Sequence, residues 1–118
     1  MKIIFNETQK ELLSKSIQRC ITILELKKVI NENVKNDIKE YKRLKNKLCP
    51  NNDYTDLSQK ESVTLTSISK TIVNKLEKII IPAYEARTDK DYTEYISKTK
   101  VNIEEFNNII RKIEAKNE

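Results

Sequence analysis

The sequence predicts an all-α protein, and three observations support this prediction. Glycine is absent from the 118 residues, although tight β-hairpins and phosphate-binding loops depend on it. Three capping residues are each followed by Glu or Gln three positions later, which is typical of a helix start. Apolar side chains then recur at spacings of three and four residues. We expect an antiparallel three-helix bundle with a long first helix, folded as a single helical domain over residues 1–118.

The first predicted helix begins after Asn6, which can form a capping box with Gln9. The side chains in register along the segment are Leu13, Ile17, Cys20, Leu24, Val34, Ile38, Tyr41 and Leu48. This register favours one continuous helix over residues 7–48, about 60 Å long at 1.5 Å per residue. The alternative is a turn at the polar residues 31–33, which would convert the three-helix bundle into a four-helix one.

The second predicted helix begins after Ser58, which pairs with Glu61, and spans about residues 59–81. We expect it to end or kink there, because Pro82 disfavours the helical conformation of the residue before it. Its apolar stripe consists of Leu65, Ile68, Ile72, Leu76 and Ile79. Between the first two helices, the proline, asparagines and aspartates of residues 49–56 predict a loop.

The third predicted helix spans about residues 92–116 and begins after Asp91, which pairs with Glu94 as a cap. A second loop is expected at residues 87–90. The seam of the third helix alternates spacings of four and three, as in a coiled coil. Its residues are Tyr92, Ile96, Thr99, Ile103, Phe106, Ile110 and Ile113.

Enzymatic function is not indicated. The chain has no His for acid–base chemistry near neutral pH, and it contains neither a nucleophile elbow nor a phosphate loop. Cys20 lies in the apolar seam and Cys49 at a helix C-terminus, so both are interpreted as structural. The acidic residues Glu85, Asp89, Asp91 and Glu94 fit helix capping better than a metal site, since their spacing matches no calcium loop. We therefore expect no catalytic residue, metal or cofactor.

Aromatic and guanidinium side chains gather around Pro82 and the loop after it. Tyr and Arg dominate protein interfaces because they bury a large area and retain a polar group. We therefore predict a partner-binding surface formed by Tyr54, Tyr84, Arg87 and Tyr95. The corresponding function is a non-enzymatic protein-binding module, a small adaptor or inhibitor of the kind carried by phages or mobile elements, which occludes a partner surface.

The alternative function is binding of nucleic acid or another phosphate ligand. Residues 39–47 contain five cations and one carboxylate, within a chain of net charge +5. The five cations are Lys39, Lys42, Arg43, Lys45 and Lys47. Such a face could contact phosphates, although cations near a helix C-terminus also stabilise the helix dipole.

Location and assembly follow from the apolar residues. No apolar run approaches the roughly 20 residues of a membrane span, so we expect a cytoplasmic protein without a membrane partner. A continuous first helix would extend beyond two partners of about 25 residues each, near 37 Å long. Its uncovered apolar side chains predict a homodimer. The same prediction follows from the isoleucines that a single seam can bury only in part, which are Ile79, Ile80, Ile81, Ile109 and Ile110.

Overall fold

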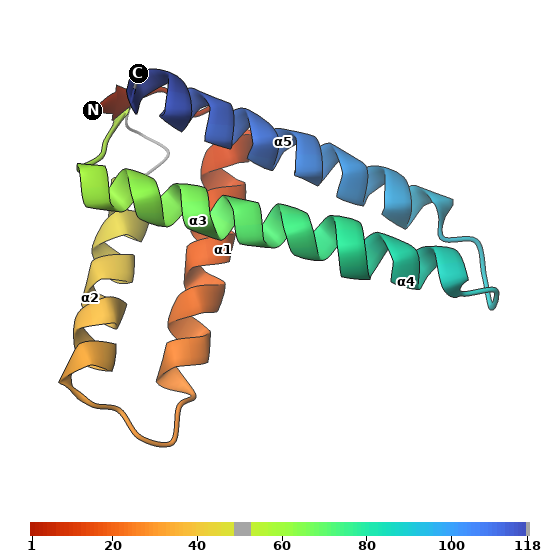
Figure 1. The fold of residues 1–118 in the computed structure, drawn as a ribbon, viewed down its shortest axis with the longest axis horizontal. Helices are drawn as coiled ribbons and strands as arrows, with labels where there is room; N and C mark the ends of the chain where they lie inside the picture. Colours follow the sequence, from red (N-terminus) through yellow and green to blue (C-terminus); the bar gives the residue numbers. More distant parts are fainter. Residues whose placement is uncertain (49–52, 118) are drawn as a thin grey trace. The chain divides into compact units, whose positions relative to one another are not determined.

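The computed structural model describes residues 1–48 and 53–117 and is 78% helical, which confirms the all-α class (Figure 1). Contacts divide the chain into two compact units, Met1–Glu61 and Ser62–Glu118. The single domain over residues 1–118 stays a prediction. None of the helices in the described ranges is both long and apolar enough to cross a membrane.

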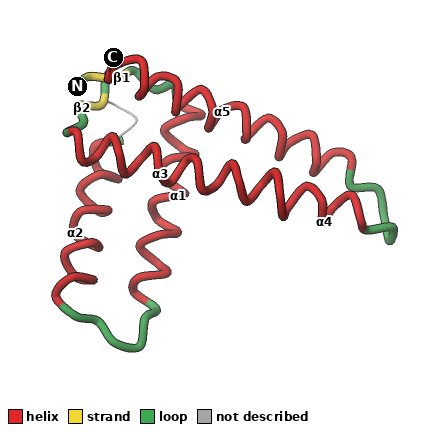
Figure 2. Tube along the Cα trace, in the orientation of Figure 1, coloured by secondary structure: helices red, strands yellow, loops and turns green. Residues whose placement is uncertain are grey.

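The first unit is a helical hairpin closed by a small sheet. Helices α1 (Glu7–Glu25) and α2 (Glu32–Lys47) run antiparallel beside each other (Figure 2). Strands β1 (Lys2–Ile3) and β2 (Thr55–Asp56) pair antiparallel, with Lys2 opposite Asp56. The fully or almost fully buried apolar side chains of the unit are Ile3, Phe5, Leu13, Ile17, Ile21, Leu44, Leu48 and Leu57.

The predicted continuous helix over residues 7–48 is wrong, because residues 26–31 interrupt it. Helix α1 ends at Glu25, and the N–H of the capping residue after it, Leu26, donates to the carbonyl of Thr22 at 3.1 Å. The side chain of Asn31 accepts from the N–H of Val34 at 3.0 Å and starts α2. A new N-cap satisfies backbone donors that a continuous helix would satisfy internally. The chain folds back at this break, so that α1 packs against α2.

The second predicted helix continues beyond its expected end. Helix α3 (Gln59–Lys75) passes into the π-helical turn η1 (Leu76–Ile80) and then into α4 (Ile81–Ala86). The N–H of Ile81 donates to the carbonyl of Leu76, five residues earlier. Pro82 thus falls in the first turn of α4, where its missing N–H is tolerated. The extra residue of the π turn also shifts the apolar stripe, so that Ile79 is exposed and Ile81 is buried.

The last predicted helix is confirmed as α5 (Thr93–Asn117). It lies beside η1 and α4 in the second unit (Figure 1). The four C-terminal residues of its predicted seam are all buried, together with Ile109. These buried residues are Ile103, Phe106, Ile109, Ile110 and Ile113.

Candidate functional site

Three tyrosine rings stack where α4 and α5 meet. The ring centroid of Tyr84, on α4, lies 5.4 Å from that of Tyr92 and 5.7 Å from that of Tyr95. The centroids of Tyr92 and Tyr95 are 5.9 Å apart. These separations fall within the favourable range for aromatic pairs, which stabilise a structure by about 0.5–1.5 kcal/mol each beyond their buried area. The stack therefore fixes the rings relative to one another.

Two cations lie over the rings of this stack. The guanidinium carbon of Arg87 is 5.0 Å from the Tyr92 centroid. The Nζ atom of Lys90 is 5.1 Å from the centroids of both Tyr92 and Tyr95. Positive charge above a ring face is attracted to its negative quadrupole. The α4–α5 loop, which carries both cations, is thereby ordered against the rings.

Asp89 completes the cluster from the same loop. The hydroxyl of Tyr92 lies 3.0 Å from each carboxylate oxygen of Asp89 and donates to them. The Nε atom of Arg87 is 3.4 Å from one of these oxygens. Burial and this hydrogen bond raise the pKa of Tyr92, and the same bond lowers the pKa of Asp89. The phenol is therefore neutral and the carboxylate charged at neutral pH.

The side chains of the cluster differ in their exposure to solvent. The buried ones support the cluster, and the exposed ones form its surface. Tyr92 is 6% exposed, which confirms it as a core residue, and Tyr84 is half-buried. Tyr95 is 47% exposed, and the side chain of Arg87 is 58% exposed. Ile79, on η1, adds a large exposed aliphatic side chain to the second unit. Tyr95 and Arg87 thus present their side chains to solvent from a rigid base.

The acidic residues near this cluster bond backbone and side-chain groups of the same unit. Asp91 accepts from the N–H of Thr93 at 2.9 Å and from its hydroxyl at 2.6 Å, which caps α5. These bonds replace the predicted capping box, since Asp91 bonds Thr93 in place of Glu94, and the carboxylate of Glu94 pairs with Lys98 at 3.1 Å. No group of three potential metal ligands comes together within residues 1–48 and 53–117. The carboxylates therefore give no reason to place a metal here.

The predicted basic face of α2 divides into two sets. The Nζ atom of Lys45 donates to the Gln18 side chain at 2.7 Å, which ties α2 to α1. Lys47 donates to the carbonyl of Asp56 at 3.1 Å and to Glu61 at 2.7 Å. Lys45 and Lys47 thus have structural contacts. The three remaining cations, Lys39, Lys42 and Arg43, are exposed.

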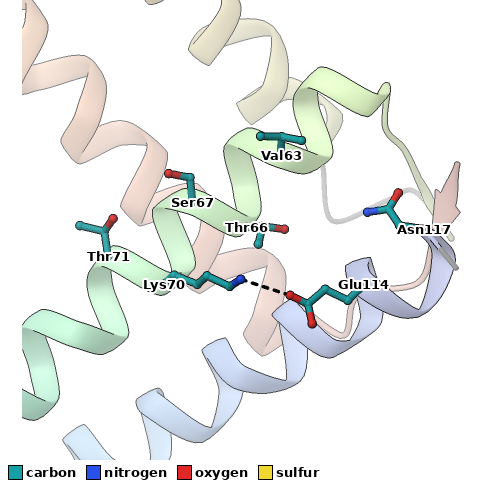
Figure 3. Close-up of a pocket in the computed structure, with 7 residues that line it drawn as sticks. All are labelled: Val63, Thr66, Ser67, Lys70, Thr71, Glu114 and Asn117. Carbon is teal, nitrogen blue, oxygen red and sulfur yellow. Dashed lines mark ion pairs between the residues drawn. The ribbon is translucent and has the colours of Figure 1, made fainter.

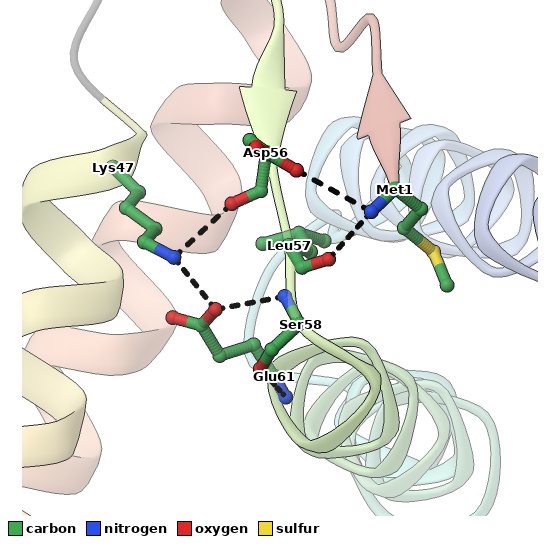
Figure 4. A network of polar contacts seen from close by, with 6 residues as sticks. All are labelled: Met1, Lys47, Asp56, Leu57, Ser58 and Glu61. Carbon is green, nitrogen blue, oxygen red and sulfur yellow. Dashed lines mark hydrogen bonds and ion pairs between the residues drawn. The ribbon is translucent and has the colours of Figure 1, made fainter.

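Lys47 belongs to a polar network that closes the first unit (Figure 4). Glu61 accepts from the N–H of Ser58 at 2.9 Å, while the Ser58 hydroxyl accepts from the N–H of Glu61 at 3.1 Å, which confirms the predicted capping box. Burial opposes ionisation of Glu61, but its bonds to Lys47 and Ser58 outweigh this effect and lower its pKa. The amino nitrogen of Met1 bonds the carbonyl of Leu57 at 2.8 Å. The network anchors the segment around β2.

A groove of about 450 Å³ in the second unit offers less chemistry (Figure 3). Its walls carry hydroxyl, amide and aliphatic groups, and its charged residues, Lys70 and Glu114, pair at 3.3 Å. The lining residues are Val63, Thr66, Ser67, Lys70, Thr71, Glu114 and Asn117. Because its two charged groups face each other, we do not place the candidate site in this groove.

Of the two cysteines, Cys20 lies within the described residues. Cys20 is a free thiol on α1 and is half-buried. Burial raises its pKa, so it carries less thiolate at neutral pH than an exposed cysteine and is a poorer nucleophile. Cys49 lies outside the described residues, as do residues 50–52 of the predicted loop. The remainder of that loop contains β2.

The structure brings together three of the four predicted partner-binding residues, Tyr84, Arg87 and Tyr95. Tyr54 is 46% exposed in the first unit, where Lys2 lies 4.7 Å from its ring centroid. No protein-family model, curated protein or solved structure matches the chain. A function therefore has to follow from the geometry of the chain's own residues.

Proposed function

We propose that the chain is a non-enzymatic protein-binding module, a small adaptor or inhibitor that occludes a surface of its partner. Tyr95 and Arg87 make the main contacts with the partner, and the ring of Tyr84 supports this surface by stacking against Tyr95. The proposal is carried by the ordered stack of three tyrosines, which leaves Tyr95 and Arg87 exposed. Side chains already held in place lose little conformational entropy when they bind. The role of Tyr54 stays a separate prediction.

The charge of the surface defines the partner that it fits. Asp89, Asp91 and Glu94 are engaged by side chains or backbone of their own unit. Arg87 also pairs with Asp89 through its Nε atom, but its side chain is 58% exposed, and together with the exposed ring of Tyr95 it is what the surface offers a partner. A complementary protein surface has an apolar patch with a carboxylate at its edge, because Arg forms two parallel hydrogen bonds with a carboxylate.

Location, origin and assembly are part of the same proposal. We propose a cytoplasmic protein from a phage or mobile element, with four helical segments in place of three. The homodimer was predicted from the overhang of a continuous first helix, and this argument fails because α1 and α2 fold back. Ile79 stays 59% exposed, so the homodimer stays a prediction on that ground, and sedimentation at micromolar concentration distinguishes it from a monomer near 13.9 kDa.

A photo-crosslinking amino acid at position 95 tests the proposed surface. The same group at Val101, which is 61% exposed on α5, is the control. A partner captured only from position 95 is then purified and titrated against Y95A and R87A. Interface hot spots of this kind lose about 2 kcal/mol or more, or roughly 30-fold in affinity, when truncated. Unchanged affinity of both variants for the purified partner would refute the proposed contact surface.

A second candidate function, phosphate or nucleic-acid binding, is supported by the exposed cations Lys39, Lys42 and Arg43. At 100° per residue these three residues project from one side of α2. Phosphate contacts of this kind are independent of sequence and weaken steeply as salt rises. The candidate site excludes Lys45 and Lys47, whose ammonium groups bond within the first unit.

A mobility-shift titration at low and high salt tests this second function. The triple variant K39E/K42E/R43E should lose retention of nucleic acid while its far-UV spectrum stays helical. The control K75E/K78E/K100E makes the same change of net charge at exposed positions of the second unit. Equal effects of the two triple variants would show non-specific attraction and would exclude a binding face on α2.

A further inference from the structure

Four large aliphatic side chains are exposed around the loop that joins α1 to α2. Leu26 and Val29 are each 77% exposed, Ile23 is 59% exposed and Ile30 is 44% exposed. Within the first unit, this loop lies at the end of the hairpin opposite β1 and β2 (Figure 1). Contiguous exposed apolar patches mark interaction sites in soluble proteins. The loop is therefore a candidate docking surface.

Cations accompany these aliphatic side chains. Lys27 and Lys28 separate Leu26 from Val29 and are exposed. On α2, Lys35 joins the exposed cations Lys39, Lys42 and Arg43 on the outward side of the helix. Glu32, at the start of that side, pairs with Lys35 at 3.6 Å, and Glu40 pairs with Lys60 at 2.8 Å. The loop thus combines apolar side chains with the two exposed cations Lys27 and Lys28, against the one exposed carboxylate of Glu25 beside them.

We propose that the α1–α2 loop docks onto the surface of an anionic membrane. Leu26, Val29 and Ile30 enter the boundary between lipid headgroups and acyl chains. Lys27 and Lys28 keep their ammonium groups at the level of the lipid phosphates and carboxylates. This proposal replaces the expectation of no membrane partner, which considered only membrane-spanning segments. It is independent of the tyrosine cluster and adds a second surface to the protein.

Charge favours this occupant over a second copy of the chain. A dimer through the loop would bring Lys27 and Lys28 of both copies together, and like charges at an interface oppose association. An anionic lipid surface instead attracts the two lysines of each molecule. The turn of a hairpin also suits a planar surface, which offers no groove.

Insertion of the loop can be measured with a fluorescent reporter. The chain contains no Trp, so V29W introduces a single indole at an exposed loop position. Its emission should shift to the blue with vesicles of phosphatidylcholine and phosphatidylserine, and stay unchanged with phosphatidylcholine alone. The control V101W carries the indole on α5 at a comparably exposed position and should show no shift with either vesicle.

Vesicle co-sedimentation separates the apolar and the charged contributions. L26S/V29S should reduce binding to phosphatidylserine vesicles to the level seen with phosphatidylcholine. K27E/K28E should weaken binding by more than about 25-fold, since a lysine near an anionic surface contributes about fivefold. V63S/V101S and K75E/K78E, at exposed positions of the second unit, should bind like the wild type. Helical far-UV spectra check that all variants are folded.

Three outcomes would overturn the proposal. The first is no binding of the wild type to phosphatidylserine vesicles, or no blue shift of V29W. The second is loss of binding in K27E/K28E with full retention in L26S/V29S, which would indicate phosphate binding by charge alone. The third is a wild-type dimer that L26S/V29S converts to a monomer without any vesicle binding, which would assign the loop to self-association.

Discussion

Replacing Phe106 by Ala tests the core of the second unit. Phe106 is 3% exposed on α5, and Ile103, Ile109 and Ile110 beside it are also buried. Removal of a buried Phe side chain loses its transfer free energy and leaves a cavity, at a cost of about 3–5 kcal/mol. The matched change V101A, on the exposed side of the same helix, should alter stability by no more than about 0.5 kcal/mol.

Urea and thermal unfolding of the two variants measure different parts of this prediction. The urea midpoint gives the change in unfolding free energy. The ratio of the melting-temperature shift to this energy depends on how much of the chain unfolds together. It should be about 4 °C per kcal/mol for cooperative unfolding of all 118 residues, and about 8 °C for roughly half of them. The smaller ratio is expected for the single domain that the sequence predicts.

The two readouts can each contradict the reasoning. An unchanged urea midpoint for F106A would show that α5 does not pack through this seam. A large change in V101A would show that the exposed side of α5 is covered by another surface. A ratio near the larger value would mean that the units Met1–Glu61 and Ser62–Glu118 unfold separately, and the prediction of one cooperative domain would be wrong.

Three further changes test the local interactions. In E61Q, the loss of the bond from Lys47 should lower stability near pH 7. This deficit should shrink as pH falls below the unfolded pKa of about 4.3, because the stability from a lowered folded pKa is complete above that value and is lost as pH falls through the folded pKa; a deficit that does not change with pH would contradict it. S69A should raise stability by about 1–2 kcal/mol, since the buried Ser69 hydroxyl has no hydrogen-bond partner among the described residues, and a buried unsatisfied group is unfavourable; a lower urea midpoint would exclude this. N31A should reduce stability by about 1 kcal/mol through loss of the cap on Val34, whereas N33A should not; equal urea midpoints of these two would show that the cap contributes nothing.

Features that depend on local sequence were predictable. The capping boxes of Asn6 with Gln9 and of Ser58 with Glu61 form as expected. A cap requires only a side-chain oxygen and a backbone donor three residues apart, so no distant part of the chain is needed to specify it. The seam of α5 was equally accessible, because a spacing of three and four residues within one helix defines its buried side.

The break between α1 and α2 could not be found from register alone. Two helices joined by six residues can keep the same apolar count as one continuous helix. The local signal was Asn31, three residues before Val34, whose N–H it accepts. Neither Gly nor Pro accompanies it, and Asn is common elsewhere in this chain. The packing of α1 against α2, a tertiary contact, decides between the two possibilities.

The basic segment shows a second limit of sequence reasoning. Lys42 and Lys47 are equivalent in the sequence, since both are cations within the last turns of one helix. Lys47 contacts Glu61, fourteen residues away, and the peptide carbonyl of Asp56. These partners reach Lys47 only because the chain returns along the hairpin to form β2 beside β1. Topology therefore decides which lysine is exposed and which forms structural contacts. The spacing of cations along the sequence carries no information about topology.

The same misplaced helix concealed the aliphatic loop. In a continuous helix over residues 7–48, Ile23, Leu26 and Ile30 would lie beside the predicted seam and not in it, so the sequence assigned them no surface of their own. Because α1 ends at Glu25, Leu26, Val29 and Ile30 lie in a loop and are exposed. An exposed cluster of large apolar side chains is more informative than a buried one, because burial alone explains the latter. The correction to the first helix is therefore what exposes the candidate membrane-docking surface.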